Sequence, residues 1–240
     1  MAPHPFAALD AIYVINLDSR PDRLRAIEGE LARIGLSFAS PNVIRHAAYR
    51  PQSQGSFPSL GARGCFISHL TALKAAHGAG HKQVLILEDD ALFTMRLRGG
   101  RGAELAAHLE TRDWDMSYLG FRLMDGSTPH GRGWRSVAPD TDITCAHAIV
   151  WRGPAIARAI PYLDAMLARE AGDPAGGPMH VDGAYNWLRR ASPDLIACRA
   201  ARQIVTQRAS DSDIAARTRY RNSAMIGLLR RLKDFRARWA

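Results

Sequence analysis

The sequence predicts an α/β domain with a mostly parallel central sheet flanked by helices, followed by a basic C-terminal helix. Apolar runs without helical spacing alternate with segments of helical periodicity, which is the order expected of β-α units. The chain has 240 residues, of which 47% are hydrophobic, so it is long enough for one domain with a substantial core. We therefore expect a domain over residues 1–215 and a helical appendage over residues 216–240.

The first predicted β-α unit begins close to the N-terminus. Residues 12–17 are β-branched, aromatic or aliphatic at almost every position, which favours a strand. Pro21 then stands in the first turn of a predicted helix that ends at Gly35. Residues 41–64 are rich in Pro, Gly, Ser and Gln, and this composition predicts a long loop near an active site. A second helix is predicted over residues 65–77.

The segment that follows this helix is the most informative one in the chain. Four aliphatic residues at 84–87 predict a buried strand, which stops in Glu88, Asp89 and Asp90. Ligands of open α/β sheets bind beyond the carboxyl ends of the strands. Adjacent carboxylates repel one another, and Mg²⁺ or Mn²⁺ would relieve that repulsion. The alternative is that Asp89 or Asp90 caps a helix beginning at Ala91.

The rest of the chain continues the alternation of strands and helices. Its predicted elements are strands at residues 114–120 and 144–151, a polar connection at 121–142, a helix at 154–167, a Gly/Pro loop at 171–178, a short helix at 180–190 and two strand-like segments within 195–206.

Composition narrows the classes of function. The formal net charge of +9, from 32 Lys and Arg against 23 Asp and Glu, predicts attraction to nucleic acid, anionic lipid or phosphorylated substrates. The three cysteines are far apart and show no C-x-x-C spacing, so neither a disulfide framework nor a zinc site is expected. The chain shows no secretory signal and no apolar run that would span a bilayer, so we expect a cytoplasmic protein.

The C-terminal segment combines an apolar stripe with many arginines. From residue 217 to 240 the stripe consists of Met225, Leu228, Leu232, Phe235 and Trp239. Such a pattern is typical of an amphipathic helix on anionic lipid, which predicts a peripheral position at the inner face of the cytoplasmic membrane. The alternative is a helix whose stripe packs on the domain. Nucleic acid is not expected as a partner, because no recognition motif accompanies the charge.

Five blocks of motifs occur in one order along the chain. They are Val14-Ile15-Asn16-Leu17 with Arg20 and Arg23, Gly64-Cys65 with Ser68-His69-Leu70, the segment from Leu85 to Ala91, the segment from Trp114-Asp115 to Leu119-Gly120, and His147-Ala148. Together they resemble glycosyltransferase family 25, the bacterial lipopolysaccharide and lipooligosaccharide glycosyltransferases. The resemblance implies a GT-A-like fold, a nucleotide-sugar donor such as a UDP-hexose, Mn²⁺ or Mg²⁺, and inverting transfer of a hexose, often galactose, to a saccharide or glycolipid hydroxyl.

The resemblance also implies a metal site and a catalytic base. Asp90, with Glu88 or Asp89, would hold the ion, and we assign Glu88 and Asp90 as the metal ligands. An inverting transfer needs a carboxylate to take the proton of the acceptor hydroxyl, and Asp182 is our candidate. Its alternative role is the N-cap of the short helix that follows. Asp115 and Asp125 are the other candidates for the base.

The remaining implied residues belong to the donor pocket. They are Asn16, Arg20, Arg23, Ser68, His69 and Asp89. A guanidinium group suits a diphosphate, which favours the arginines. From the residues alone, Arg23 could equally lie on the wet face of its helix, and His69 could be a packed side chain without a ligand.

Two other functions compete with the transferase. A sugar nucleotidyltransferase would share the α/β domain and the metal carboxylates, but it would need a Gly-rich phosphate loop after the first strand, where this chain has Asp18-Ser19-Arg20-Pro21. A non-catalytic protein that binds polyanions or membranes through its arginines would leave the acidic strand end unexplained.

Overall fold

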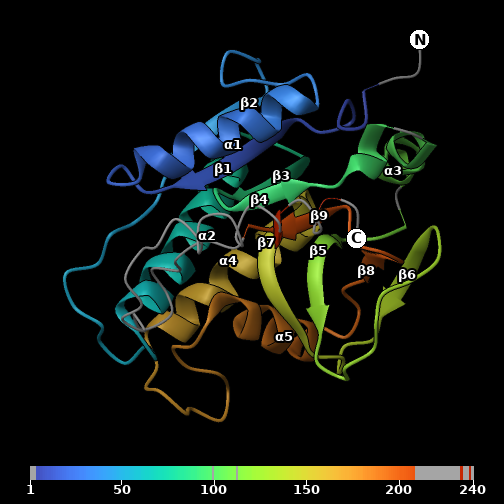
Figure 1. Ribbon diagram of the computed structural model, residues 1–240. Coiled ribbons are helices and arrows are strands. Elements are labelled where there is room, and N and C mark those ends of the chain that lie inside the picture. Colours follow the sequence, from blue (N-terminus) through green and yellow to red (C-terminus); the bar gives the residue numbers. More distant parts are fainter. Residues whose placement is uncertain (1–3, 99, 112, 209–232, 235–237, 239–240) are drawn as a thin grey trace.

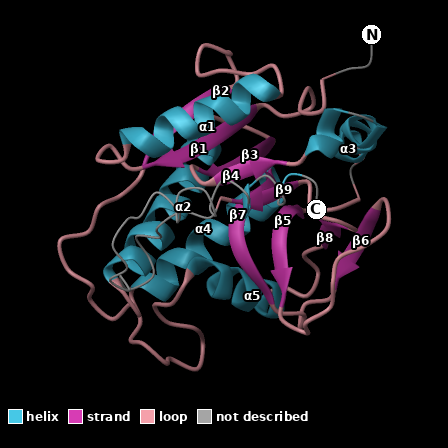
Figure 2. Ribbon diagram, viewed as in Figure 1, coloured by secondary structure: helices cyan, strands magenta, loops and turns pink. Residues whose placement is uncertain are grey.

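The structure, a computed structural model, contains one large and one small sheet surrounded by helices (Figures 1 and 2). It describes residues 4–98, 100–111, 113–208, 233–234 and 238. The strands are β1 (Ala11–Asn16), β2 (Val43–Ala47), β3 (Gln83–Glu88), β4 (Ala91–Phe93), β5 (Met116–Leu123), β6 (Trp134–Val137), β7 (Ile143–Arg152), β8 (Ala197–Ala200) and β9 (Val205–Gln207).

The large sheet has seven strands in the order β2-β1-β3-β7-β5-β8-β6. Strands β1, β2 and β3 are parallel, and so are β5 and β8, whereas β7 and β6 are antiparallel to their neighbours. Five of the seven strands therefore point the same way. This confirms the predicted α/β class with a mostly parallel central sheet, which is the arrangement expected of a GT-A-like domain.

The helices cover both faces of this sheet. They are α1 (Pro21–Arg33), α2 (Leu60–Gly78), the 3-10 helix η1 (Met95–Arg98), α3 (Gly100–Glu110), α4 (Gly153–Leu167) and α5 (Val181–Ala191). Helices α2, α4 and α5 pack on one another, while α1 lies against β4 (Figure 1). The β1-α1-β2 and β2-α2-β3 crossovers run in opposite directions along the sheet, so right-handed connections put α1 and α2 on opposite faces.

Strand β3 fixes the position of the acidic segment. Residues 84–87 are fully buried, because β1 and β7 flank the strand on either side. Ile15 lies opposite Glu88 in the parallel β1-β3 pairing, so both strands end at the same edge of the sheet. The polar residues that follow them are therefore brought together, as the sequence predicts.

Three strands occur where the sequence does not predict them. The predicted loop at residues 41–64 contains β2, and helix α2 begins at Leu60 rather than at residue 65. The polar connection at 121–142 contains β6. Residues 91–93 form β4, so the alternative in which Asp89 or Asp90 caps a helix there is wrong. These strands are short or lie at a sheet edge, where the apolar signal is weak.

The small sheet ties the far end of the domain to the acidic segment. Strand β9 pairs with β4 in antiparallel register, which sets Gln207 opposite Ala91. The backbone N–H of Arg208 then donates to the carbonyl oxygen of Asp90 at 2.7 Å. Residues distant in sequence thus close one side of the strand end.

Most of the predicted C-terminal helix over residues 216–240 lies outside the described residues. Arg238 is described, and it forms an ion pair of 2.6 Å with Glu30, a buried residue of α1. This contact is in keeping with the alternative in which the segment packs on the domain. Among the helices of the described ranges, none is long and apolar enough to cross a membrane.

A histidine is buried between two indole rings beside β5. His108 stacks on Trp134 and Trp114, with ring centroids 3.5 and 4.9 Å away, and its Nε2 lies 3.1 Å from Ser117 Oγ. Burial lowers the pKa of His108 to about 4, and the nearby charge of Asp113 only partly opposes this. The fold therefore holds this imidazole in its neutral form.

The neutral state of His108 predicts a loss of stability in acid. In the unfolded chain His108 takes up a proton near pH 6.5, whereas in the folded protein it stays neutral down to about pH 4. The stability that the neutral imidazole gives the folded state is therefore complete above pH 6.5 and is lost as the pH falls through about 4. Denaturant unfolding should show the free energy of unfolding falling by up to about 3 kcal/mol over this window. The fall should be smaller in His108→Gln and unchanged in His130→Gln, an exposed control. Equal pH profiles for all three proteins would contradict the assignment.

Candidate functional site

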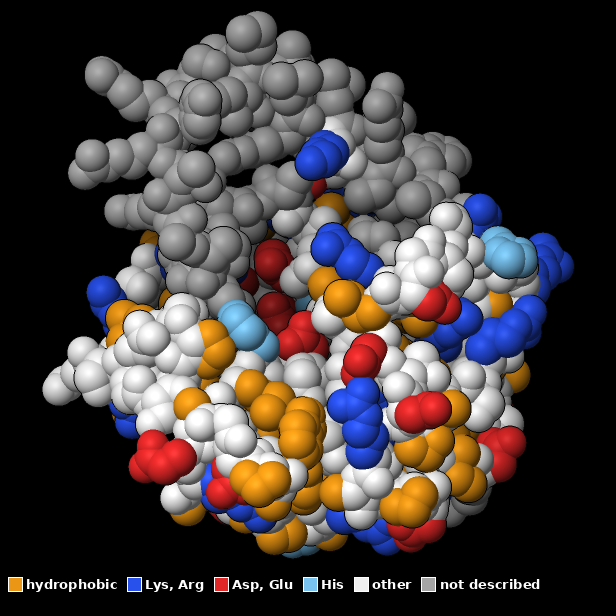
Figure 3. Space-filling view, turned by 90° about the horizontal axis from the view of Figure 1, so that it is seen from below, with side chains coloured by type: hydrophobic (Ala, Val, Ile, Leu, Met, Phe, Trp, Pro, Cys, Tyr) orange, Lys and Arg blue, Asp and Glu red, His pale blue; other side chains and the backbone are white. Residues whose placement is uncertain are grey.

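The three acids that follow β3 have different surroundings. Glu88 is the last residue of the strand, and Asp89 and Asp90 form the turn into β4. Figure 3 shows acidic side chains set back in a hollow on one face of the molecule, with a histidine beside them. Their separate partners decide what each carboxylate can do.

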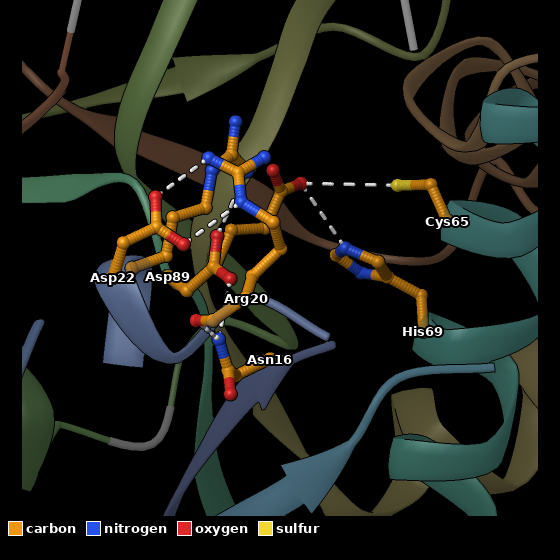
Figure 4. Close-up of polar contacts among 8 residues, drawn as sticks. Asn16, Arg20, Asp22, Cys65, His69 and Asp89 are labelled. Carbon is orange, nitrogen blue, oxygen red and sulfur yellow. Dashed lines mark hydrogen bonds and ion pairs between the residues drawn. The ribbon is translucent and has the colours of Figure 1, made fainter. Parts of the chain in front are cut away.

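Asp89 is bound by two of the three predicted residues of the first β-α unit. Asn16 Nδ2 donates to Asp89 Oδ2 at 2.8 Å, and Arg23 Nη1 donates to Oδ1 at 3.0 Å (Figure 4). Burial raises the pKa of Asp89, while the charge of Arg23 and both hydrogen bonds oppose that rise. Asn16 in turn accepts from the guanidinium of Arg45 through Oδ1. Asp89 therefore fastens the end of β3 to β1 and α1.

Glu88 faces helix α2 on the opposite side. Its Oε1 lies 3.2 Å from His69 Nε2 and 4.0 Å from Cys65 Sγ, and both side chains reach toward it from one helix (Figure 4). Burial raises the pKa of Glu88, but the hydrogen bond and charge of His69, helped by His147 and Arg23, outweigh burial and leave it below its ordinary value. Glu88 is therefore ionised at neutral pH.

Asp90 carries an incompletely satisfied carboxyl group. Its Oδ1 is buried and has no hydrogen-bond partner within the described part of the chain. Burial, followed by the negative charge of Glu88, raises the pKa of Asp90 to about 7. A buried oxygen without a partner, next to an ionised carboxylate, is the chemistry that a divalent cation would complete.

These residues border a cleft of about 360 Å³. The residues that the sequence analysis assigned to the donor and the metal line it with one exception, Asn16, and the lining set is Arg20, Arg23, Ser68, His69, Glu88, Asp89 and Asp90. The sequence analysis did not assign Tyr49, Arg50, Cys65 and Gln207, which line it too. The i, i+4 spacing of Cys65 and His69 is a sequence signal that could have pointed to Cys65. Gln207 has no such signal, because only the pairing of β9 with β4 brings it to the cleft.

Ser68 acts on the wall of the cleft through the backbone. Its hydroxyl donates to the Gly64 carbonyl at 2.6 Å and accepts from the Tyr49 N–H at 2.8 Å. A Cβ at Gly64 would lie only 3.0 Å from the Tyr49 oxygen, so a larger residue here would push the Tyr49 backbone away by a few tenths of an ångström. Ser68 therefore holds the segment after β2 against α2, with the half-exposed Tyr49 ring beside the cleft.

Arg20 lies at the rim of the cleft and binds an acid of its own helix. Its Nε and Nη2 donate to the two oxygens of Asp22 at 3.0 and 2.9 Å. The hydrogen bond from Arg20 is the main cause that lowers the pKa of Asp22 to about 2. Asp22 is largely exposed, so this ion pair leaves the guanidinium within reach of solvent.

Asp182 lies in the first turn of α5 and is held by backbone N–H groups. Its Oδ2 accepts from the N–H of Cys145 at 3.0 Å, and its Oδ1 accepts from the N–H of Gly183 at 2.8 Å. The N-cap of α5 is His180, so the alternative role of Asp182 as N-cap is wrong. In the described part of the chain, the residues lining the cleft do not include Asp182, although its charge raises the pKa of Cys65, which does line it.

The other candidate bases have local roles. Asp115 Oδ2 accepts from the Ile196 N–H at 2.8 Å, and Asp125 Oδ1 accepts from the Ser127 N–H at 2.9 Å. His147 is buried, and its Nε2 lies 3.2 Å from the Val205 carbonyl oxygen. Neither aspartate lines the cleft among the described residues.

The fold and the cleft together define an α/β domain with a polar cleft at the carboxyl ends of its parallel strands, where such sheets bind ligands. Residues 9–103 match the family model for glycosyltransferase family 25 (LPS biosynthesis protein). This match confirms the resemblance to glycosyltransferase family 25, and it covers the segment from β1 to the start of α3.

Two curated relatives named as glycosyltransferase 25 family members agree with this match. The chain is 30% identical over 138 residues to a "Glycosyltransferase 25 family member" from Drosophila pseudoobscura pseudoobscura, covering 50% of this chain and 22% of the relative. It is 28% identical over 129 residues to the "Probable inactive glycosyltransferase 25 family member 3" of Bos taurus, covering 46% of this chain and 22% of that one. The chain thus spans about a fifth of the length of these relatives.

Solved structures overlap with the chain more distantly. A glycosyltransferase involved in the glycosylation of the major capsid of PBCV-1 aligns with a TM-score of 0.49 at 10% identity, covering 84% of this chain and 94% of that one. A putative glucose-1-phosphate thymidylyltransferase from Bacillus anthracis aligns with a TM-score of 0.40 at 9% identity, covering 79% and 68%.

The raised pKa of Asp90 predicts that this carboxyl group destabilises the metal-free protein at high pH. The folded protein holds the proton of Asp90 more tightly than the unfolded chain does, so the protonated carboxyl group stabilises the fold fully below pH 3.8. This stabilisation is lost as the pH rises through about 7. Asp90→Asn should therefore raise the free energy of unfolding at pH 8 by up to about 4 kcal/mol, and by much less at pH 4.

Denaturant titrations with a chelator present would measure this effect. Asp140→Asn, at an exposed position, is the matched control and should change neither value. A pH-independent effect of Asp90→Asn would show that the carboxyl group does not hold its proton in the folded state.

Proposed function

We propose that this protein is a metal-dependent, inverting glycosyltransferase that moves a hexose, galactose as the first candidate, from a UDP-hexose to a lipopolysaccharide or another surface saccharide. One observation carries the proposal. The residues assigned to the donor and the metal, from Asn16 to Asp90, all lie inside the segment that matches glycosyltransferase family 25. All of them except Asn16 line one cleft at the edge of the sheet, and Asn16 binds Asp89 beside it.

The cleft has the size and charge that a nucleotide sugar requires. Its volume of about 360 Å³ is in the range of small-molecule sites. Arg20, Arg23 and Arg50 line it, and a guanidinium offers paired N–H donors to the oxygens of a diphosphate. The ion pairs of Arg20 with Asp22 and of Arg23 with Asp89 fix the direction of two of these groups.

Glu88 and Asp90 fit a divalent cation. Glu88 is ionised, and Asp90 presents a buried oxygen that has no partner among the described residues. Mn²⁺ or Mg²⁺ bound there would neutralise the negative charge that develops on the leaving nucleoside diphosphate. Asp89 would keep the strand end in place through Asn16 and Arg23, so its role in donor binding is indirect.

Asp182 is the proposed base for the acceptor hydroxyl. It lies at the start of α5, and its charge reaches Cys65 in the wall of the cleft. The two backbone N–H groups that it accepts from would hold its carboxylate in one orientation. Such a fixed carboxylate can take a proton from a hydroxyl that attacks the sugar.

The acceptor and the cellular position follow from the same proposal. A lipid-anchored saccharide acceptor would suit an enzyme held at the cytoplasmic face of the membrane by basic residues of the 216–240 segment. The net charge of +9 supports attraction to an anionic surface.

A panel of sugar nucleotides tests the proposal. UDP-, GDP- and CMP-sugars should be screened for binding and hydrolysis with Mn²⁺, with EDTA and with the Asp90→Ala variant. We expect one sugar nucleotide to be turned over only with metal, and we expect Asp90→Ala to lose this turnover by at least about a hundredfold. Asp140→Asn should behave as wild type. If no sugar nucleotide binds under any condition, the proposal is wrong and polyanion binding becomes the better explanation.

The base has a separate prediction. Asp182→Asn should lower kcat for transfer by about 10²–10⁴ while leaving the Kd of the donor unchanged, because a base acts only in the chemical step. Steady-state kinetics and donor titration would measure the two effects, with Asp164→Asn as an exposed control. A loss of donor affinity as large as the loss of kcat would instead indicate that Asp182 acts by supporting the backbone at Cys145.

A further inference from the structure

A second set of donor atoms lies in the wall of the cleft, beside the carboxylates. Cys65 and His69 are one helical turn apart on α2, so both side chains project from the same face. Glu88 approaches them from the end of β3 (Figure 4). The thiol sulfur, the imidazole nitrogen and the carboxylate oxygen all lie within 4.8 Å of one another.

The distances between these atoms are close to those around a small metal ion. In tetrahedral sites the bonds from zinc are roughly 2.3 Å to sulfur and 2.0–2.1 Å to nitrogen or oxygen, so neighbouring ligand atoms lie roughly 3.3–3.7 Å apart. Glu88 Oε1 is 3.2 Å from His69 Nε2 and 4.0 Å from Cys65 Sγ. The distance between Glu88 and His69 already matches a pair of ligands, and the Cys65 sulfur would have to move closer to coordinate the same ion.

His69 is oriented by a partner on the far side of its ring. Its Nδ1 lies 3.0 Å from the hydroxyl oxygen of Tyr185, and both residues are fully buried. An imidazole that binds an ion through Nε2 carries its proton on Nδ1, and Tyr185 is in position to accept that hydrogen bond. Such a second partner is a regular feature of histidines that bind metal.

The electrostatic surroundings also favour a cation. Four carboxylates act on Cys65 through their charge, and they are those of Glu88, Asp182, Asp90 and Asp89. Burial, and then these charges, raise the pKa of the Cys65 thiol, and a cation bound beside the cleft would offset the negative charge that keeps the thiol protonated.

We propose that Cys65, His69 and Glu88 form a binding site for a transition-metal ion of the class of Zn²⁺ or Co²⁺. One sulfur, one nitrogen and one oxygen ligand suit such an ion better than Mg²⁺, which prefers oxygen ligands only. Binding releases the proton of the Cys65 thiol. The cleft side is left as the fourth position, which is the arrangement of catalytic rather than structural sites. The catalytic meaning of this site rests on the proposed function, whereas the binding does not.

Cobalt provides a direct readout of the sulfur ligand. Metal-free protein should be titrated with Co²⁺ while the near-ultraviolet band of charge transfer from thiolate to metal is recorded, and Zn²⁺ should then displace the cobalt. We expect saturation at about one ion per chain and no displacement by a large excess of Mg²⁺. Cys65→Ser should abolish the band and weaken Zn²⁺ binding by at least about tenfold, because even partners outside the ligand set cost 10–100-fold.

Two further variants separate ligation from folding. Cys145→Ser changes a thiol near Asp182 that is not part of the cluster, so it should leave the band intact. Tyr185→Phe keeps the ring and removes only the hydroxyl beside His69, so it should keep the band but weaken Zn²⁺ binding by about 10–100-fold.

Several outcomes would overturn the inference. They are a wild-type spectrum without the band, a band that survives in Cys65→Ser, and cobalt that Mg²⁺ displaces. The first would mean that Cys65, His69 and Glu88 form a hydrogen-bonded cluster only. None of these measurements uses a donor or an acceptor, so the proposed transferase activity can fail while this site stands. Glu88 is also a proposed ligand of Mn²⁺ or Mg²⁺, so the two kinds of ion would compete for this carboxylate.

Discussion

The accumulation of three carboxylates at the end of a buried strand is the constraint on which the rest of the site depends. Placed side by side without partners, they would repel one another and oppose folding. The structure reduces the repulsion in a different way for each carboxylate. Asp89 pairs with Arg23 and Asn16, Glu88 faces His69, and Asp90 has its pKa raised to about 7.

The contacts of Asp89 and Glu88 also hold the walls of the cleft in place. The pair of Arg23 with Asp89 connects α1 to the sheet, and the contact of His69 with Glu88 connects α2 to it from the other face. Two helices on opposite sides of the sheet are thus fixed around one strand end. The charge left over is on Glu88 and Asp90, where a cation or a cationic group of a ligand would reduce the repulsion.

Much of the fold could be predicted because its signals are local. The aliphatic run at residues 84–87 and the glycine after α1 mark a strand and a helix end without reference to the rest of the chain. Strand β2 gives no strand signal because it has only two neighbouring β-branched residues, Val43 and Ile44, at the edge of the sheet within a Pro- and Gly-rich stretch. The sequence therefore predicts the central strands better than the edges.

The candidate site was predictable to the same extent. Its acids and arginines follow β1 and β3 directly, so their meeting at one edge is a consequence of parallel pairing. The cysteine spacing gives no sign of a metal site at Cys65, because the position of this thiol relative to Glu88 depends on how α2 packs beside β3. Gln207 enters the cleft only through the pairing of β9 with β4, which no local pattern announces.

The central claim is that the cleft between the ends of β1 and β3 and helix α2 binds a nucleotide sugar. A crystal structure of the protein grown with UDP-galactose and Mn²⁺ tests it most directly. We predict a diphosphate beside Arg20 and Arg23, with the metal on Glu88 and Asp90. A nucleotide bound elsewhere on the domain, with this cleft containing only solvent, would contradict the account.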